Sequence, residues 1–203
     1  MKVLYLSAAL AVLDQVTKLL VKGVSIPFLG ISIEGMRYGF SVPVLGDLFR
    51  LTYIENPGMA FGINFGGKAL FSIISLAASI AIIIYLYKSR SEPLPLRLSL
   101  AMILGGAVGN MIDRMFYGVL YGEAPLFHGK VVDFFDLDFP DIDIFGYELS
   151  RWPVFNIADA SVTVGVILLL FLSRKSSEHN IPELPAGAGA DADKSITDSR
   201  QSG

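Results

Sequence analysis

The sequence predicts a membrane all-α bundle of four transmembrane helices with a small extracytoplasmic β-containing cradle. Hydrophobic residues make up 53% of the 203 residues, and charged residues make up only 17%. In ordinary soluble domains, about 45–50% of the residues are hydrophobic and about 25% are charged. Four segments are apolar over the roughly 20 residues that a helix needs to cross hydrocarbon about 30 Å thick. The stretch 36–65, between the first two segments, holds the strand-like run Leu48–Ile54 and then a glycine-rich turn, which predicts the cradle.

The four expected spans cover residues 3–22, 69–87, 97–117 and 153–172. The first has the basic start and apolar run of a cleavable signal peptide. However, Asp14, Gln15 and Lys18 interrupt the run, and no small-x-small cleavage site follows before Ser25. We therefore expect this segment to remain in the protein as a transmembrane helix.

Basic residues near the span ends predict the orientation, because Lys and Arg in short loops mark the cytoplasmic side. They precede the first span, separate the second from the third and follow the fourth, as Lys2, Lys88, Arg90, Arg97, Arg174 and Lys175. Both termini are therefore expected in the cytoplasm, and the long connections 23–68 and 118–152 outside. Residues 1–175 are expected to form one transmembrane domain. Residues 176–203, rich in Ala, Gly, Asp, Ser and Pro, are expected to form a disordered cytoplasmic tail.

Composition excludes several classes of function. A formal net charge of -3 and the lack of a basic cluster argue against nucleic-acid binding. The sequence has no cysteine, which rules out thiolate metal sites and a cysteine nucleophile. Its two histidines, His128 in a loop and His179 in the tail, form no H-E-x-x-H metal motif and are not placed to activate a serine in a span. We therefore expect neither a metal nor a cofactor.

Polar residues of three spans are expected at one depth in the membrane. With a rise of about 1.5 Å per residue, Asp14 and Asn110 both lie roughly 20 Å from the inner face. Asp159, counted from Pro153 at the start of the fourth span, lies roughly 9 Å below the outer face, which is again roughly 20 Å from the inner one. Because charges within spans are rare and usually functional, we expect a shared polar site in the outer leaflet.

Some of these charges have a structural interpretation. Asp14 and Lys18 are spaced i,i+4, and Asp113 can pair with Arg114 or with another helix. Such neighbours neutralise one another and lock a bundle together. For these four residues we favour a structural role as the wall of the site.

Asp159 differs, because its own helix provides no cation before Arg174, at the opposite face. The second unmatched acid is Asp133, in the apolar run Lys130–Phe135. Lys130 is a candidate partner for Asp133, and the alternative is a solvated loop acid like the nearby Asp136, Asp138, Asp141 and Asp143. Two carboxylates brought together in a partly dry site do not both ionise easily, so one keeps its proton. Such a pair provides an acid and a base.

Two other classes of function remain open from these residues. Acids and a lysine at mid-membrane depth are also typical of a small proton-coupled transporter, although the spans show no inverted repeat of the kind found in many carriers. A non-catalytic membrane scaffold would tolerate the loss of both Asp133 and Asp159.

Five sequence blocks, in order, resemble the motifs of the lipoprotein signal peptidase (signal peptidase II) family. They are Asp14 to Lys18, Asn56 to Gly62, Gly105 to Arg114, Val131 to Phe134 and Phe155 to Asp159. The resemblance spans roughly residues 11–172 and leaves out the tail. Compared with compact family members, the sequence carries extra residues around 117–129 and in the long acidic stretch 135–152.

The resemblance implies an intramembrane aspartyl endopeptidase that removes signal peptides from diacylglyceryl-modified bacterial prolipoproteins by cleaving before the lipidated cysteine. It implies that Asp133 and Asp159 are the catalytic pair. Residues that bind substrate or support the site are, by motif position, Asp14, Lys18, Asn56, Gly58, Asn110, Asp113, Arg114 and Asn156. It further implies prolipoprotein substrates, contact with membrane lipid, globomycin-type inhibitors, and a place in the bacterial inner membrane with the active site towards the outer leaflet.

The glycine-rich turn after the predicted strand is expected to be mobile. Gly58 and Gly62 permit backbone conformations that let the outer cradle approach a bound chain closely. We therefore expect this segment to move when substrate binds.

Overall fold

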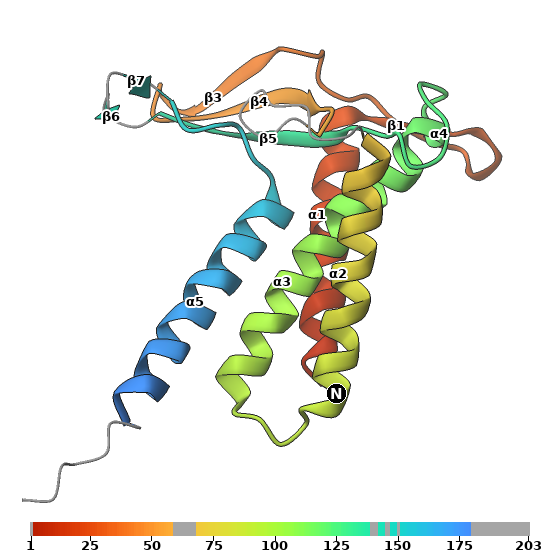
Figure 1. The fold of residues 1–203 in the computed structure, drawn as a ribbon. Helices are drawn as coiled ribbons and strands as arrows, with labels where there is room; N and C mark the ends of the chain where they lie inside the picture. Colours follow the sequence, from red (N-terminus) through yellow and green to blue (C-terminus); the bar gives the residue numbers. More distant parts are fainter. Residues whose placement is uncertain (1, 59–67, 139–141, 145–146, 150, 180–203) are drawn as a thin grey trace, which may run out of the picture. The chain divides into compact units, whose positions relative to one another are not determined.

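The computed structural model describes residues 2–58, 68–138, 142–144, 147–149 and 151–179 (Figure 1). The chain divides into two compact units, Met1–Leu169 and Leu170–Gly203. Every residue of the site described below belongs to the first unit. Residues 180–203, most of the expected disordered tail, lie outside the described residues, so the tail stays a prediction.

Four long helices form where the apolar segments predicted them. They are α1 (Leu4–Lys22), α2 (Lys68–Lys88), α3 (Leu94–Ile112) and α5 (Ile157–His179). Helix α3 begins directly after Pro93 and continues through a π-helical turn, η2 (Asp113–Tyr117), into the short α4 (Gly118–Leu120). Such π-turns are frequent at functional sites, and this one carries Asp113 and Arg114.

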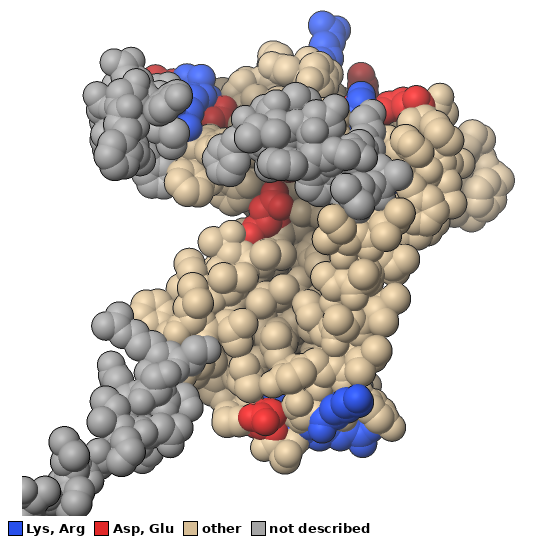
Figure 2. All heavy atoms as spheres, in the orientation of Figure 1, with Lys and Arg blue, Asp and Glu red and all other residues tan. Residues whose placement is uncertain are grey.

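Two helices are long and apolar enough to cross a membrane over their described residues, namely Leu4–Lys22 and the continuous stretch Leu94–Leu120. The described apolar parts of the other two, Ser72–Lys88 and Ile157–Leu172, are shorter. The predicted number of four complete spans therefore stays a prediction. Figure 2 shows that the charged side chains on this face gather at the ends of the helices, apart from an acidic patch in a hollow below the strands.

The expected β structure is present and lies at one end of α1, α2 and α3 (Figure 1). Strands β3 (Ser41–Leu45), β4 (Phe49–Asn56) and β5 (Val131–Leu137) form an antiparallel sheet in that order. Two hairpins accompany it: β1 (Val24–Ile26) with β2 (Ile31–Ile33), joined through the 3-10 turn η1 (Pro27–Leu29), and β6 (Ile142–Ile144) with β7 (Tyr147–Leu149). The predicted strand Leu48–Ile54 corresponds to β4.

The sheet joins the two long connections of the chain and is fixed on the helices by a small core. In the β4–β5 register, Ile54 lies opposite Asp133. The core consists of Val21, Tyr53, Tyr117, Val132 and Phe134. Burying one such apolar side chain contributes about 1.5–3 kcal/mol, so this cluster holds β5 against the end of α1 and against η2.

The fourth helix begins at Ile157, and the prediction that it begins at Pro153 was wrong. Phe155 forms an antiparallel bridge with Phe135 and donates its backbone N–H to the Phe135 carbonyl at 3.0 Å. This pairing keeps residues 153–156 out of the helix. Asp159 therefore lies in the first helical turn, roughly 3 Å along the axis from its start, and its depth in the membrane stays a prediction.

A glycine lets the start of α5 approach α3 closely. A Cβ atom at Gly106 would overlap the carbonyl oxygen of Ala158. Only glycine permits this distance between the two backbones. The contact brings Asp159 beside Asn110, one helical turn beyond Gly106.

Candidate active site

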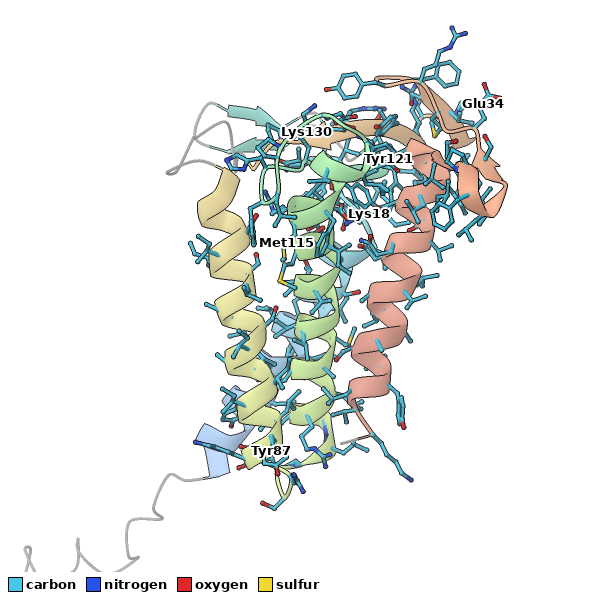
Figure 3. All side chains as sticks on the ribbon, turned by 90° about the vertical axis from the view of Figure 1, so that its right-hand side faces the viewer. Lys18, Glu34, Tyr87, Met115, Tyr121 and Lys130 are labelled. Carbon is cyan, nitrogen blue, oxygen red and sulfur yellow. The ribbon has the colours of Figure 1, made fainter. Side chains whose placement is uncertain are left out.

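A fully buried ionic cluster joins α1 to α3 and η2. The Lys18 ammonium lies 2.8 Å from Asp14 Oδ2 and 2.8 Å from Asp113 Oδ2, and it donates a hydrogen bond of 2.9 Å to Asn110 Oδ1. Its three hydrogens thus all have acceptors. Figure 3 shows Lys18 near the strand end of the helices and Tyr87 at their other end. The structure therefore pairs Asp113 with Lys18 of another helix, one of the two alternatives considered for it.

The same cluster holds the backbone next to two other acids. Asp14 Oδ1 accepts a hydrogen bond of 2.9 Å from the N–H of Ala158. Asp113 Oδ2 accepts one of 3.2 Å from the N–H of Val132. Ala158 precedes Asp159, and Val132 precedes Asp133. The cluster therefore helps to position both unmatched acids.

Gln15, Tyr117 and Gly109 support this cluster and were not among the predicted site residues. The amide nitrogen of Gln15 donates to Asp113 Oδ1 at 2.8 Å, and its oxygen accepts from the Tyr117 hydroxyl at 3.1 Å. A Cβ atom at Gly109 would lie 2.6 Å from an oxygen of Asp14. The available signals were an uncharged amide inside an apolar span and a glycine next to Asn110.

Two asparagines connect the ionic cluster to Asp133 and Asp159. Asn110 Nδ2 donates to Asp159 Oδ1 at 2.8 Å, while its own oxygen accepts from Lys18, which fixes the orientation of the amide. Asn156 Nδ2 donates to Asp133 Oδ1 at 2.6 Å, and the Asn156 backbone N–H donates to Asp159 Oδ2 at 3.3 Å. Asp133 and Asp159 therefore meet around a single residue, Asn156.

The start of α5 also orients the Asp159 side chain. Asn156 is the N-cap residue, and its Oδ1 accepts the Asp159 N–H at 2.9 Å. Because the Asp159 carboxylate accepts the Asn156 N–H in return, the two residues form a capping box. An acid in the first turn is also favoured by the helix dipole. The position of Asp159 thus follows from the helix start itself.

Asp133 lies in the middle of β5 and is only 2% exposed, so the alternative of a solvated loop acid was wrong. Burial and then the nearby charge of Asp159 raise the pKa of Asp133 to about 7, against the opposing hydrogen bond from Asn156. Lys130, its candidate partner, instead binds Glu55 Oε2 at 2.8 Å. In an extended chain, residues three apart point to opposite faces, which separates Lys130 from Asp133.

The remaining predicted residues lie around this network. Arg114, on η2, interacts electrostatically with both Asp133 and Asp159. Asn56 ends β4, and its Oδ1 accepts the N–H of Gly58 at 2.9 Å. Gly58 has φ of +95°, a conformation that residues with a side chain rarely adopt. Residue 62 lies outside the described residues, and the movement of this turn stays a prediction.

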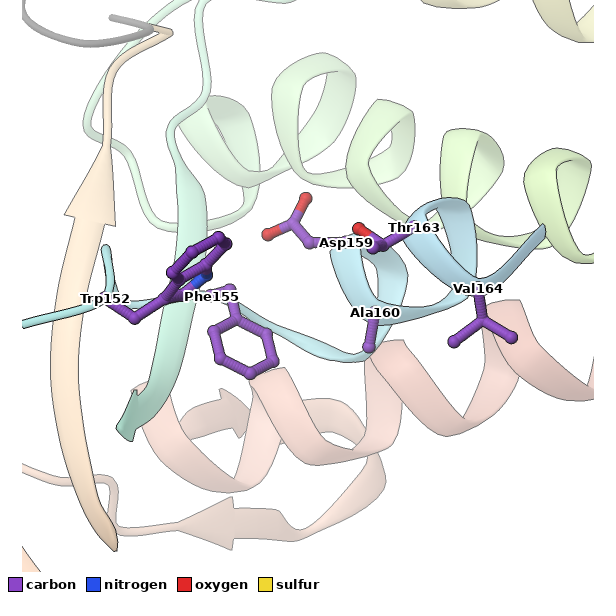
Figure 4. A pocket seen from close by; sticks show the side chains of 6 residues that line it. All are labelled: Trp152, Phe155, Asp159, Ala160, Thr163 and Val164. Carbon is purple, nitrogen blue, oxygen red and sulfur yellow. The ribbon is translucent and has the colours of Figure 1, made fainter. Parts of the chain in front are cut away.

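A cavity of about 270 Å³ opens beside Asp159. Its lining consists of Trp152, Phe155, Asp159, Ala160, Thr163 and Val164. Figure 4 shows the Asp159 carboxylate beside the indole of Trp152, with Thr163 and Val164 farther along α5. Trp152 was not predicted to belong to the site, because no charge or spacing in the sequence connects it to Asp159.

The arrangement favours acid–base chemistry. Within the described part of the chain, no group of three or more His, Cys, Asp or Glu residues is placed to hold a metal ion. Asp133 and Asp159 are joined through one asparagine, and the charge of Asp159 disfavours ionisation of Asp133. A pair that keeps one proton provides both a general acid and a general base.

Comparisons with known proteins show the family of the chain. The family model described as Signal peptidase (SPase) II matches residues 6–174. The lipoprotein signal peptidase of Pelodictyon phaeoclathratiforme is 36% identical over 163 residues, covering 80% of this chain and 84% of that protein. That of Chlorobaculum tepidum is 34% identical over 171 residues, covering 84% and 92%.

A solved structure is similar as well. It is a bacterial membrane enzyme, determined by the in meso method at 2.3 Å resolution, with 29% identity and a TM-score of 0.65, covering 90% of this chain and 93% of that one. The region matched by the family model includes Asp133, Asp159, Asn110, Asn156 and the buried ionic cluster. The chain therefore belongs to the signal peptidase II family.

Proposed function

We propose that this chain is an intramembrane aspartyl endopeptidase that removes signal peptides from diacylglyceryl-modified bacterial prolipoproteins, cutting before the lipidated cysteine. Membership of the signal peptidase II family supports the reaction class, and relatives named lipoprotein signal peptidase support the substrate class. One observation carries the catalytic assignment: Asn156 binds the carboxylates of both Asp133 and Asp159.

In the proposed mechanism, the ionised member of the pair removes a proton from a water molecule as that water attacks the scissile carbonyl carbon. The protonated member donates a hydrogen bond to the developing oxyanion and then a proton to the departing amine. The proposal assigns the two roles to the pair and not to either residue alone. Hydrolysis of the peptide bond returns the pair to its starting protonation state.

The neighbouring residues have distinct roles in this proposal. Asn110 and Asn156 hold the two carboxylates by hydrogen bonds without adding a charge. Arg114 provides a positive charge near both acids, which favours the negative charge that develops on the substrate oxygen. Asp14, Lys18 and Asp113 support the site from beneath.

The proposed setting is the bacterial inner membrane. All four helices would span it, with both termini in the cytoplasm and the strands β3, β4 and β5 on the outer side. A signal helix and acyl chains reach such a site from the lipid, so lipid contacts are part of substrate binding. Globomycin-type inhibitors are expected to occupy the same site, and the Gly58 turn is expected to move on binding.

Cleavage of a diacylglyceryl-modified peptide by the purified protein in lipid tests the proposal. Asp133→Asn and Asp159→Asn should each lower kcat/KM by roughly 10³-fold or more while the protein stays folded, because each change removes one partner of the acid–base pair. Asp47→Asn, at a carboxylate that is 78% exposed between β3 and β4, serves as the control.

Two results would contradict the proposal. Wild-type protein that leaves the lipidated peptide intact under conditions where a relative cleaves it would overturn the substrate class. Folded Asp133→Asn and Asp159→Asn variants with near-normal cleavage would overturn the catalytic assignment, and they are what a non-catalytic scaffold predicts.

A further inference from the structure

We propose that the cavity beside Asp159 is a binding subsite for one aliphatic chain of the substrate, and that Trp152 forms its selective wall. The inference rests on the proposed function, because it takes Asp159 to lie at the scissile bond. It adds a residue from the long stretch 135–152 to the recognition of substrate.

The chemistry of the lining indicates an apolar occupant. Trp152, Phe155, Ala160 and Val164 present apolar surface, and the polar groups are the Asp159 carboxylate and the Thr163 hydroxyl. The volume of about 270 Å³ lies just below the range of roughly 300–1,000 Å³ that accommodates a whole drug-sized ligand. The cavity therefore suits one substituent of a larger substrate.

Trp152 is fastened to the strand that carries Asp133. Its backbone N–H donates to the carbonyl of Leu137 at 3.2 Å. The adjacent Arg151 binds Asp136 Oδ2 at 2.9 Å and Asp138 Oδ2 at 3.5 Å. The side chain of Asp136 is only 5% exposed. Arg151 therefore binds a buried acid, which is held in place better than a surface acid would be.

The other end of this short segment is fastened as well. Phe155 pairs with Phe135 through the backbone, and the two rings pack at a centroid distance of 5.6 Å. Residues 151–155 are thus bound at both ends to β5, two to four residues beyond Asp133. A wall held in this way is preorganised, which lowers the entropy cost of binding a flexible chain.

The exposure of Trp152 is consistent with a surface that substrate covers. Its side chain is 52% exposed although it lines an apolar cavity. An aliphatic chain bound against the indole would cover this exposed surface and place a substrate group next to Asp159. The chain can come from an apolar side chain of the signal peptide near the scissile bond or from an acyl chain of the diacylglyceryl group.

Two substrate series separate these sources. In the first series, each substrate has alanine in place of leucine at one position within three residues of the scissile bond, and a different position is changed in each substrate. In the second, the acyl chains of the lipidated cysteine are shortened. Wild-type protein should discriminate against the shortened substrate by roughly tenfold or more in kcat/KM at the position that fills the cavity.

Trp152→Ala should reduce this discrimination to within about twofold in one series, and that series identifies the occupant. Trp152→Phe should retain most of it. Val164→Phe, which fills the cavity from α5, should lower kcat/KM for the long-chain substrate by roughly tenfold. The control Val166→Phe, on an exposed part of α5 outside the cavity lining, should leave both series unchanged.

Unchanged discrimination in both series for Trp152→Ala and Val164→Phe, with normal cleavage by the wild type, would overturn the subsite and leave the proposed function standing. A wild type that cleaves no member of either series would instead overturn the proposed function. If the Trp152→Ala variant fails to fold, the comparison of Val164→Phe with its control Val166→Phe tests the subsite.

Discussion

The molecule contains two pairs of aspartates with different surroundings, of which Asp14, Asp113 and Asp133 are buried and Asp159 is half-buried. Asp14 and Asp113 each lie 2.8 Å from the Lys18 ammonium. Asp133 and Asp159 instead receive hydrogen bonds from the asparagines and the backbone. The first pair therefore has a cation in direct contact, whereas the hydrogen bonds to the second pair come from neutral amides. In the proposed mechanism, one residue type thus both builds the site and reacts in it.

The two pairs are also connected. The N–H groups of Val132 and Ala158, which directly precede the two proposed catalytic acids, donate to Asp113 and Asp14. The charged pair therefore sets the backbone positions on which the reactive pair depends. Changes to the first pair should affect stability first, and changes to the second should affect chemistry first.

The largest stability effect is expected for Lys18→Met. It leaves Asp14 and Asp113 buried without their cation, and breaking a buried ion pair costs about 3–5 kcal/mol. Thermal unfolding in detergent, with Lys88→Met on the exposed end of α2 as the control, measures the effect. If both variants unfold at the same temperature as the wild type, the ionic cluster does not stabilise the fold.

Asp133→Asn is expected to act in the other direction and to stabilise the protein by about 1–2 kcal/mol at pH 8. Because burial and the charge of Asp159 raise the pKa of Asp133 to about 7, the native state holds this proton after the unfolded state has lost it. Stability therefore falls as pH rises from about 4 to 7.

The gain from Asp133→Asn should vanish near pH 4, where the carboxyl group is protonated in the native protein. Unfolding midpoints of wild type and variant at the two pH values provide the measurement. A variant that is less stable than the wild type by the same amount at both would show that the carboxylate carries no burial penalty.

The smallest effect is expected for Lys130→Met. Lys130 is 40% exposed, and its partner Glu55 is also bound by Lys22 and by the Tyr53 hydroxyl. Partly exposed ion pairs contribute about 1 kcal/mol or less. A loss comparable to that of Lys18→Met would show that charge pairing at the outer sheet matters as much as the buried cluster.

The four long helices could be predicted from the sequence, and so could the candidate acids Asp133 and Asp159, because both depend on local signals. A run of about 20 apolar residues predicts a helix, and an acid within such a run stands out. The start of α5 could not be placed, since Pro153, Val154 and Phe155 are as apolar as the helix that follows. Their strand-like pairing with Phe135 depends on a distant segment.

The sequence also did not predict which side chains on different strands and helices contact each other. Lys130 is close to Asp133 in the chain, yet the alternation of a strand directs it to Glu55. Trp152 lines the cavity next to Arg151, which forms a salt bridge with Asp136, fifteen residues away. Such contacts depend on which distant segments pair with each other, and local patterns in the sequence do not show this.

The dependence of kcat/KM on pH tests most directly the claim that Asp133 and Asp159 work as a singly protonated pair. The raised pKa of Asp133 predicts that cleavage of a lipidated peptide falls as pH rises through about 7, because the pair then loses the proton it must donate. A rate that stays constant from about pH 6 to about pH 9 in folded protein would contradict it.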